Sequence, residues 1–379
     1  MPARVVLAGA HGYGATYLRR LVQLKADGVA RLAGVCDPRP PSPDHDGLPP
    51  GTPWTDDLAD LLGRVDADVV VVAAPIHRHH DLAETALRAG ADVMLEKPPT
   101  PTLAGFDALS DLSARLGRVC QVGFQSFGTD AVEHVRSLVA DGAIGDVRGV
   151  GAAGAWVRTR AYWSRSAWAG RRELDGRPVV DGVVTNPLAH ALATALRIEG
   201  SDRRGELTSV HTELFRANDI EADDTSCIRV TTAGGGTVVA ALTLCAQEQR
   251  EPYVVVTGSR GRVVLWYKTG RVDVTGPAGT DTRTFPFTDL LENLLRHRAD
   301  PAVRLISPLA RSGAFTEVLE AVRTAPPPTR ITAPHRVVLG AGLDERPVVA
   351  GVDDAVDDAA TTLRTFRELD LPWAGTVAA

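Results

Sequence analysis

The chain has 379 residues, which is too long for one ordinary hydrophobic core and long enough for two domains. Hydrophobic residues make up 44% and charged residues 23%, a balance typical of globular proteins that excludes a disordered chain. The net charge of −6 argues against a general nucleic-acid binder and against a protein held on an anionic membrane, because both need a basic surface.

Several features predict a protein of the cytoplasm. No stretch approaches the roughly 18 consecutive apolar residues of a membrane span, and the first residues, MPARVVLAGAHGYG, lack the layout of a secretory signal. Four cysteines stand singly inside apolar runs, as buried thiols do in a reducing compartment: Cys36, Cys120, Cys227 and Cys245. No Cys or His spacing is typical of a metal site, and the HRHH at residues 77–80 is interpreted as a helix start, so no metal is expected.

Strands and helices alternate over the first third of the chain. Strands are predicted at residues 3–8, 30–36, 69–73, 92–95 and 119–122, and helices at about 14–26, 56–62, 79–89 and 103–116. Thr55 is the predicted N-cap of the second helix, and seven prolines predict a loop at 38–53. This alternation indicates a Rossmann domain, a doubly wound parallel sheet, over residues 1–123.

After Gly123 the pattern changes to consecutive strands joined by tight turns. Strands are predicted at 147–157, 206–215, 225–232, 237–246, 253–257, 262–267 and 271–275, and helices near 129–140, 288–296, 309–323 and 353–368. We expect an α+β domain over residues 124–335 with a large open, mostly antiparallel sheet. Residues 336–379 are expected to form a helical segment that packs back on the body.

The first strand-to-helix turn carries a glycine pattern typical of dinucleotide binding. Its three glycines are Gly9, Gly12 and Gly14. The turn fits G-x-G-x-x-G imperfectly, because His11 stands at the second glycine position. Asp37 closes the second strand 23 residues beyond Gly14, which suits the acid that binds the adenosine ribose and favours NAD over NADP. Arg39 leaves NADP open, and the alternative that Asp37 only starts the turn before Pro38 also stays open.

Ligands of open parallel sheets bind at the carboxyl ends of the strands, where residues 9–14, 74–80 and 96–98 all fall. The stretch VVVVAAPIHRHHDLAETALRAGADVMLEKPPTPT, residues 69–102, resembles the Gfo/Idh/MocA oxidoreductase family in its strand, proline turn, helix and Glu-Lys-Pro signature. His79 falls at the histidine that this family has after the proline turn.

The resemblance implies that Lys97 is the lysine of the catalytic site, reaching the nicotinamide and the substrate hydroxyl, and that the Lys97–Pro98 bond is cis. Only three of the 41 basic residues are lysines, which favours a role for Lys97 that arginine would not fill. The alternative is a solvated lysine at a strand end. The predicted cofactor-binding residues are Gly9, His11, Gly12, Tyr13, Gly14, Asp37, Arg39, Ala74, Pro75, His79, Glu96 and Lys97.

The segment DGVVTNPLAH, residues 181–190, resembles the family's glycine-containing stretch that ends in Asp-x-x-x-His on a helix. The i, i+4 spacing predicts Asn186 and His190 on one helical face. His190 is the predicted general base or the group that polarises the substrate hydroxyl. Asn186 replaces the family's aspartate and cannot take a proton, which leaves the acid/base partition between Lys97 and His190 open. The alternative for His190 is a histidine of the core.

The segment WVRTRAYWSRSAWAG, residues 156–170, mixes aromatic residues with arginines directly after a strand. Aromatic faces pack on the C–H surfaces of sugars, and guanidinium groups bind hydroxyls or carboxylates. We therefore predict that Arg160, Tyr162, Trp168 and Asn186 bind substrate, with a structural contact between domains as the alternative.

Together these patterns and the resemblance predict an NAD(P)-dependent oxidoreductase that transfers a hydride at a secondary hydroxyl or ketone of a sugar, cyclitol or related polyol. Two alternatives stay open. One is a non-catalytic dinucleotide-binding sensor or scaffold, suggested by His11 and Asn186, and the other is NAD-dependent glycoside cleavage through transient oxidation. The expected partner is a small carbohydrate-like substrate, and the resemblance implies a homodimer or homotetramer formed through an exposed face of the second sheet.

Overall fold

The computed structural model describes residues 1–40, 48–277 and 279–375. The chain forms two compact units: the first comprises Met1–Gly128 and Thr288–Ser312, and the second comprises Thr129–Phe287 and the described residues after Ser312. Residues 288–312 belong to the first unit, whereas the expected boundaries placed them in the second domain, residues 124–335. Part of the predicted proline-rich loop, residues 41–47, lies outside the described residues, as do residues 376–379 of the predicted C-terminal segment.

The first unit contains a six-stranded parallel sheet with the order β3-β2-β1-β4-β5-β6. Its strands are β1 (Ala3–Ala8), β2 (Ala30–Cys36), β3 (Trp54–Thr55), β4 (Val69–Val72), β5 (Asp92–Leu95) and β6 (Cys120–Val122). All residues of β4 and β5 are buried, as expected for apolar runs in the middle of a parallel sheet. The strand order reverses between β1 and β4, which is where open α/β sheets bind ligands, so the predicted Rossmann fold is confirmed.

Helices cover the sheet of the first unit. They are α1 (Gly14–Ala26), α2 (Leu58–Arg64), η1 (Ile76–Arg78), α3 (His79–Arg88), α4 (Leu103–Leu116), η2 (Gln125–Phe127), α8 (Leu290–Ala299) and η3 (Leu309–Ser312). Helices α1 and α8 share one apolar cluster with β1, to which Leu18 and Leu294 contribute. The predicted cap of α2 was wrong: Thr55 pairs with β2, and the Asp57 carboxylate accepts hydrogen bonds from the first backbone N–H groups of the helix.

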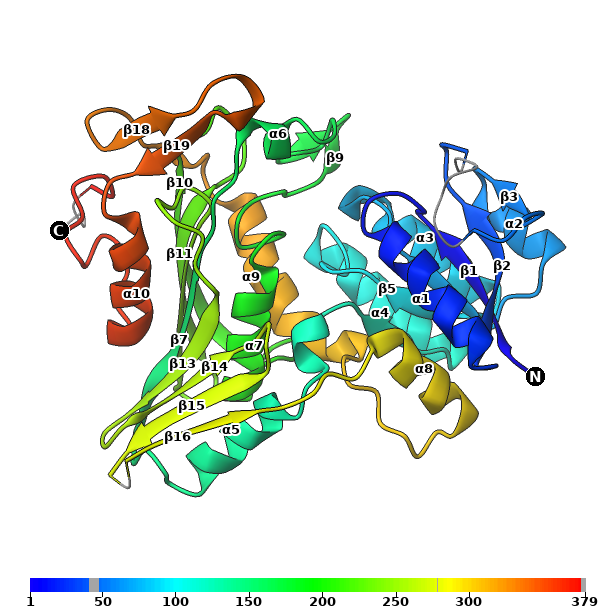
Figure 1. The fold of residues 1–379 in the computed structure, drawn as a ribbon, viewed down its shortest axis with the longest axis horizontal. Helices are drawn as coiled ribbons and strands as arrows, with labels where there is room; N and C mark the ends of the chain where they lie inside the picture. Colours follow the sequence, from blue (N-terminus) through cyan, green and yellow to red (C-terminus); the bar gives the residue numbers. More distant parts are fainter. Residues whose placement is uncertain (41–47, 278, 376–379) are drawn as a thin grey trace. The chain divides into compact units, whose positions relative to one another are not determined.

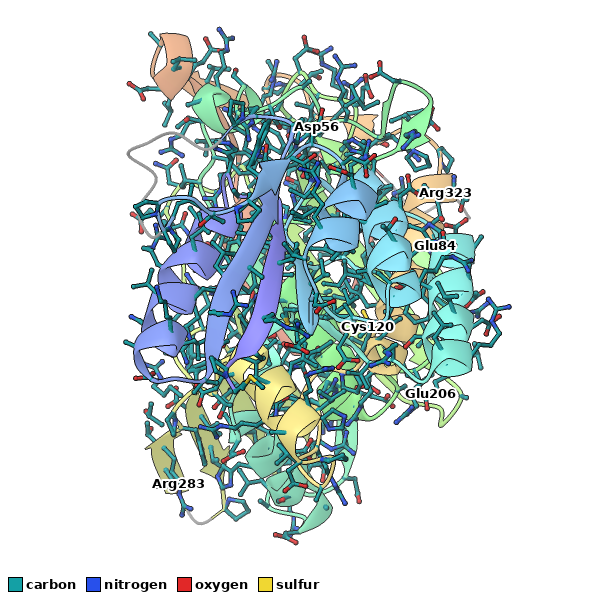
Figure 2. All side chains as sticks on the ribbon, turned by 90° about the vertical axis from the view of Figure 1, so that its right-hand side faces the viewer. Asp56, Glu84, Cys120, Glu206, Arg283 and Arg323 are labelled. Atoms are coloured by element: carbon teal, nitrogen blue, oxygen red, sulfur yellow. The ribbon has the colours of Figure 1, made fainter. Side chains whose placement is uncertain are left out.

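The second unit contains a nine-stranded sheet with the order β16-β15-β14-β13-β7-β12-β11-β10-β17. Its strands are β7 (Val147–Ala155), β10 (Leu207–Arg216), β11 (Thr225–Thr232), β12 (Thr237–Thr243), β13 (Tyr253–Gly258), β14 (Arg262–Trp266), β15 (Arg271–Gly276), β16 (Gly279–Thr284) and β17 (Thr329–Arg330). All pairs are antiparallel except β7–β12 and β10–β17, which confirms the mostly antiparallel sheet. The exposed strand β16 was not predicted because its residues show no apolar alternation; Arg283 projects from it (Figure 2).

The remaining elements of the second unit lie around this sheet. They are α5 (Ala131–Ala140), α6 (Arg160–Trp163), β8 (Glu173–Leu174), β9 (Arg177–Pro178), α7 (Ala189–Glu199), α9 (Gly313–Thr324), β18 (Arg336–Leu339), η4 (Gly342–Asp344), β19 (Arg346–Val349) and α10 (Val352–Thr362). The C-terminal segment begins with the β18–β19 hairpin rather than a helix. The sequence signal for this hairpin is a pair of valine-containing runs, residues 336–339 and 346–349, on either side of a turn that contains glycine.

Both faces of the nine-stranded sheet carry helices. Helices α7 and α9 lie on one face and α10 on the opposite face, over β7 and β12 (Figure 1). The approach of α10 is close, because a Cβ added at Gly151 would come within 1.9 Å of the Ala360 carbonyl oxygen. One apolar cluster joins α10 to this face of the sheet and includes Phe215, Phe366 and Trp373. The chain itself therefore covers part of this face of the sheet.

No helix among residues 1–40, 48–277 and 279–375 is both long enough and apolar enough to cross a membrane.

Candidate functional site

The glycine turn between β1 and α1 folds tightly against the ends of two strands. A Cβ added at Gly9, where φ is +92°, would lie 2.6 Å from the Ala73 carbonyl oxygen, and one at Gly14 would lie 1.9 Å from the Gly9 oxygen. Gly12 also has a positive φ, of +60°, but faces open space. No side chain caps the first turn of α1. The turn therefore combines an accessible backbone with an uncapped helix N-terminus, which favours a phosphate group.

Asp37 connects the end of β2 to this turn through hydrogen bonds. Its carboxylate is buried, with 4% of the residue exposed, and accepts hydrogen bonds from the backbone N–H groups of Ala10 and Arg39, each at 2.9 Å. The His11 Nε2 atom lies 3.9 Å from the same carboxylate, whereas the Arg39 side chain is 70% exposed. Each carboxylate oxygen can accept two hydrogen bonds, so Asp37 retains capacity for ribose hydroxyls. The turn and this acid fit a dinucleotide.

His79 connects the ends of β4 and β5. Its Nδ1 atom lies 2.8 Å from the Pro98 carbonyl oxygen and its Nε2 atom 2.8 Å from the Ala74 carbonyl oxygen. Burial lowers the pKa of His79 to about 4, so the ring is neutral at pH 7 and donates one of these two bonds at a time. The ring thus holds the backbone of the predicted cofactor-binding residues 74–75 beside the Lys97–Pro98 peptide.

This burial makes the stability of the first unit depend on the charge of His79. The folded pKa of about 4 lies below the ordinary value of 6.5, so the unfolded chain binds the proton first as the pH falls. Stability contributed by the neutral ring is therefore lost between pH 6.5 and 4, by roughly 2 kcal/mol at pH 5. We expect the urea midpoint to fall more between pH 7 and pH 5 in the wild type than in His79→Gln. His80→Gln is the matched control and should keep the wild-type dependence; equal pH dependence in all three proteins would contradict the assignment.

Glu96 lies beneath the backbone of Lys97. It is 7% exposed, and its Oε1 atom accepts hydrogen bonds from the Tyr17 hydroxyl at 2.7 Å and from Gln125 Nε2 at 2.9 Å. Burial raises the pKa of Glu96 and also raises that of Tyr17. A Cβ at Gly123 would meet the carboxylate at 2.6 Å, so glycine leaves the space that this group needs. Sequence reasoning missed Tyr17 and Gln125, because a hydroxyl or an amide at these positions carries no motif.

Lys97 is half-buried at the carboxyl end of β5, and the bond to Pro98 is cis, as the resemblance implies. The Lys97 backbone N–H lies 3.2 Å from Glu96 Oε2, and it donates a hydrogen bond to that atom. The three predicted segments meet at this edge: residues 9–14 pack on Ala73, and His79 bridges Ala74 and Pro98. The first unit thus brings the glycine turn, the proline turn and Lys97 to one edge of its sheet.

In the second unit, Asn186 does not lie on a helix. Helix α7 begins at Ala189, and residues 183–188 form turns, so the expected common helical face of Asn186 and His190 was wrong. The reason is local, since the residue before a proline is disfavoured in helical conformation and Pro187 follows Asn186.

The Asn186 side chain instead binds Asp181. Its Nδ2 atom donates to Asp181 Oδ1 at 2.5 Å, and Asp181 Oδ2 accepts from the Gly170 N–H and the Arg165 guanidinium, both at 2.8 Å. Asp181 is 2% exposed. A carboxylate at position 186 would face this buried carboxylate directly, so an amide is the group that fits here.

His190 is the second residue of α7 and is half-buried. Its ring is stacked on the buried ring of Tyr267, with centroids 6.5 Å apart and an angle of 27° between the planes. Of the predicted substrate-binding residues, Tyr162 and Trp168 both lie against the Arg165 guanidinium. Arg160 is exposed and pairs with Glu345 at 2.6 Å, outside that group.

Within the described residues, no group of three or more His, Cys, Asp or Glu side chains is arranged to hold a metal ion.

The parallel sheet, its glycine turn and the buried acid at the end of β2 define a dinucleotide-binding α/β protein. Comparison with known families agrees: residues 3–124 match the model described as oxidoreductase family, NAD-binding Rossmann fold, and residues 132–264 match the Gfo/Idh/MocA C-terminal domain. These two matches cover more than half of the chain. The chain belongs to the Gfo/Idh/MocA oxidoreductase family.

Curated relatives match part of the chain. It is 37% identical over 143 residues to a dTDP-3,4-didehydro-2,6-dideoxy-α-D-glucose 3-reductase from Streptomyces violaceoruber, covering 37% of this chain and 41% of the relative. It is 34% identical over 94 residues to the D-glucoside 3-dehydrogenase of Escherichia coli, covering 25% and 26%. The matched region thus spans less than half the length of these relatives.

Solved structures share the fold over most of the chain. The WlbA dehydrogenase from Bordetella pertussis, in complex with NADH and UDP-GlcNAcA, superimposes with a TM-score of 0.69 at 20% identity, covering 85% of this chain and 95% of that one. A variant of a 3-ketoreductase from Actinomadura kijaniata, in complex with TDP-benzene and NADP, gives a TM-score of 0.68 at 18% identity, covering 88% and 100%.

Proposed function

We propose that this protein is an NAD(P)-dependent oxidoreductase that transfers a hydride at a secondary hydroxyl or ketone of a sugar, cyclitol or related polyol. The observation that carries the proposal is the meeting of three features at one sheet edge: the glycine turn, the buried acid Asp37, and the half-buried Lys97. Family membership supports the reaction class, and the names of the relatives supply the substrate class.

In this proposal the turn at residues 9–14 holds the pyrophosphate through its backbone and the N-terminus of α1. The Asp37 carboxylate holds the ribose hydroxyls and disfavours a 2′-phosphate, so NAD is the preferred cofactor. When bound, the nicotinamide supplies hydride acceptance or donation at the reacting carbon. Residues 74–75 line the same edge and are held by His79.

Lys97 is the proposed catalytic group of the first unit. Oxidation of a carbinol removes a hydride from carbon and a proton from oxygen, and the oxygen becomes more negative as the reaction proceeds. A half-buried ammonium stabilises that charge more strongly than a fully solvated one would. Glu96 is a positioning residue, since it binds the Lys97 backbone and is itself fixed by Tyr17 and Gln125.

His190 is the proposed acid/base group of the second unit. Its ring is oriented by Tyr267, and the preceding turn is held by the contact between Asn186 and Asp181. In the oxidation direction the neutral imidazole accepts the hydroxyl proton, and in reduction the imidazolium returns it. Asn186 donates to Asp181 through its amide nitrogen, which holds the turn before His190, and its amide is the proposed contact to a substrate hydroxyl.

A turnover screen tests the reaction class. The purified full chain is incubated with a panel of sugars and cyclitols and with NAD⁺ or NADP⁺, and the absorbance of the reduced nicotinamide is followed. We expect NAD-linked oxidation of at least one compound, with a product two hydrogens lighter by mass spectrometry. Tight cofactor binding without any product would instead favour a sensor, and cleavage of a glycoside without net cofactor change would favour transient oxidation.

A further inference from the structure

In the segment that follows β7, two arginines lie over aromatic rings. The Arg158 guanidinium carbon lies 4.7 Å from the ring centroid of Trp156 and 5.1 Å from that of Tyr162. The Arg165 guanidinium carbon lies 3.8 Å from the Tyr162 centroid and 4.5 Å from the Trp168 centroid. Aromatic faces attract cations and fix the planes of the two guanidinium groups.

A third cation extends this stack from a different part of the sequence. The ammonium nitrogen of Lys268 lies 5.4 Å from the centroid of Trp156. We call the resulting row the cation ladder; its members are Lys268, Trp156, Arg158, Tyr162, Arg165 and Trp168. Among the described residues, Arg165 is the one cation of the ladder with a carboxylate partner, Asp181 at 2.8 Å. The ladder therefore carries an excess of positive charge.

Arg158 shows this excess most clearly. Among the described residues no carboxylate lies within ion-pair distance of it, and its Nη1 atom donates to the Val157 carbonyl oxygen at 2.8 Å. Partial burial lowers the pKa of its guanidinium. Holding a partly desolvated cation without a counter-charge costs free energy, which binding of an anion would recover.

The ladder and its neighbour Trp163, which packs edge-on against Tyr162, hold donors that bind nothing in the part of the chain that the structure describes. The indole Nε1 atoms of Trp156 and Trp163 are buried and have no hydrogen-bond partner there. An indole N–H only donates, as do guanidinium and ammonium groups. Unpartnered donors beside unpaired cations match a ligand that only accepts hydrogen bonds and carries negative charge.

Two members of the ladder, Arg165 and Lys268, are connected to residues around His190 within the second unit. Arg165 binds Asp181, which binds Asn186 in the turn that precedes α7. Lys268 directly follows Tyr267, on which the His190 ring stacks. An anion held by the ladder would therefore belong to a molecule that also reaches His190.

We propose that the cation ladder binds an anionic substituent of the substrate, a carboxylate or a phosphate, so that the enzyme acts on charged rather than neutral sugars. The inference rests on the proposed function, which it narrows to one substrate class. Arg158 supplies the planar pair of donors that carboxylates and phosphates accept, and Lys268 supplies a point charge that adapts to either. A neutral sugar would leave both cations uncompensated.

Calorimetric titration of the full chain, with and without NAD⁺, tests this inference with three probes that differ in charge: glucose, glucuronate and glucose 1-phosphate. We expect at least one anionic probe to bind at least about tenfold more tightly than glucose. Whether glucuronate or glucose 1-phosphate is preferred identifies the anion as carboxylate or phosphate. Equal binding of all three probes would overturn the inference.

Two variants from distant parts of the ladder, Arg158→Gln and Lys268→Gln, remove one positive charge each. We expect each to weaken binding of the preferred anionic probe by about ten- to a hundredfold and to leave glucose binding unchanged. Arg283→Gln, at an exposed arginine of β16 in the same unit, should change neither. Wild-type affinity of the anionic probes in both ladder variants would overturn the inference.

The binding experiment is independent of turnover. Tight anion binding without oxidation of any charged sugar would contradict the proposed function and leave the anion site standing. Efficient oxidation of neutral sugars together with no preference among the three probes would contradict the anion site and leave the proposed function standing.

Discussion

Replacement of Lys97 by alanine is expected to lower kcat by about a thousandfold or more, while the affinity for NAD(H) changes only a few-fold. The expected size follows from the loss of the charge that stabilises the reacting oxygen. Initial rates on a substrate found in the turnover screen, together with cofactor titration of the same variant, measure the two quantities separately.

Two further variants sharpen this test. Lys25→Ala removes an exposed lysine at the end of α1 and should retain wild-type turnover. Lys97→Arg keeps the charge but cannot give up a proton near neutral pH. Partial recovery in Lys97→Arg would assign an electrostatic role to Lys97, and no recovery would assign it a proton-transfer role. Normal turnover in Lys97→Ala would refute its place in catalysis.

The second large effect is expected at His190. His190→Asn keeps a polar side chain but removes the titratable ring, and we expect kcat to fall by about 10²- to 10⁴-fold with the loss of one limb of the pH–rate profile. His211→Asn, at an exposed histidine of β10, is the matched control and should keep both limbs. If His190→Asn changes rate only a few-fold and leaves the profile intact, His190 is a structural histidine that packs on Tyr267.

The fold of the first unit was predictable because its physical signals are local. Buried parallel strands such as β4 and β5 are continuous apolar runs, and the positions of Gly9 and Gly14 are fixed by backbone contacts that exclude any side chain. Asp37 could be placed because it ends a strand whose boundaries were clear. For these residues, the physical requirement that fixes the structure, burial or space for the backbone, is the same one that limits which amino acid can stand there.

The supporting contacts of the site were less accessible from sequence. Glu96 and His79 were expected among the cofactor-binding residues, but the structure shows their polar atoms bound to Tyr17, Gln125 and backbone carbonyls. Which partner a buried polar group finds depends on residues far away in the chain. No periodicity or motif records that choice.

The second unit shows where local rules misled us. A helical face was expected for Asn186 from its spacing to His190, although Pro187 argues against a helix at that point. Within the segment after β7, Arg160 was favoured over Arg158 and Arg165, yet Arg160 pairs with Glu345 and the other two stack on aromatic rings. An arginine's partner is set by tertiary packing, so residue type alone could not separate the three.

The central claim is that residues 9–14 and Asp37 form an NAD site, and a thermal-shift assay with NAD⁺, NADH, NADP⁺ and NADPH tests it most directly. A ligand at a hundredfold its dissociation constant adds about 2.7 kcal/mol to stability, which moves Tm by several degrees. We predict that NAD⁺ and NADH raise Tm more than the phosphorylated forms, and that Asp37→Asn reduces this preference. Absence of any shift, with no nicotinamide released when the purified protein is denatured, would contradict the claim.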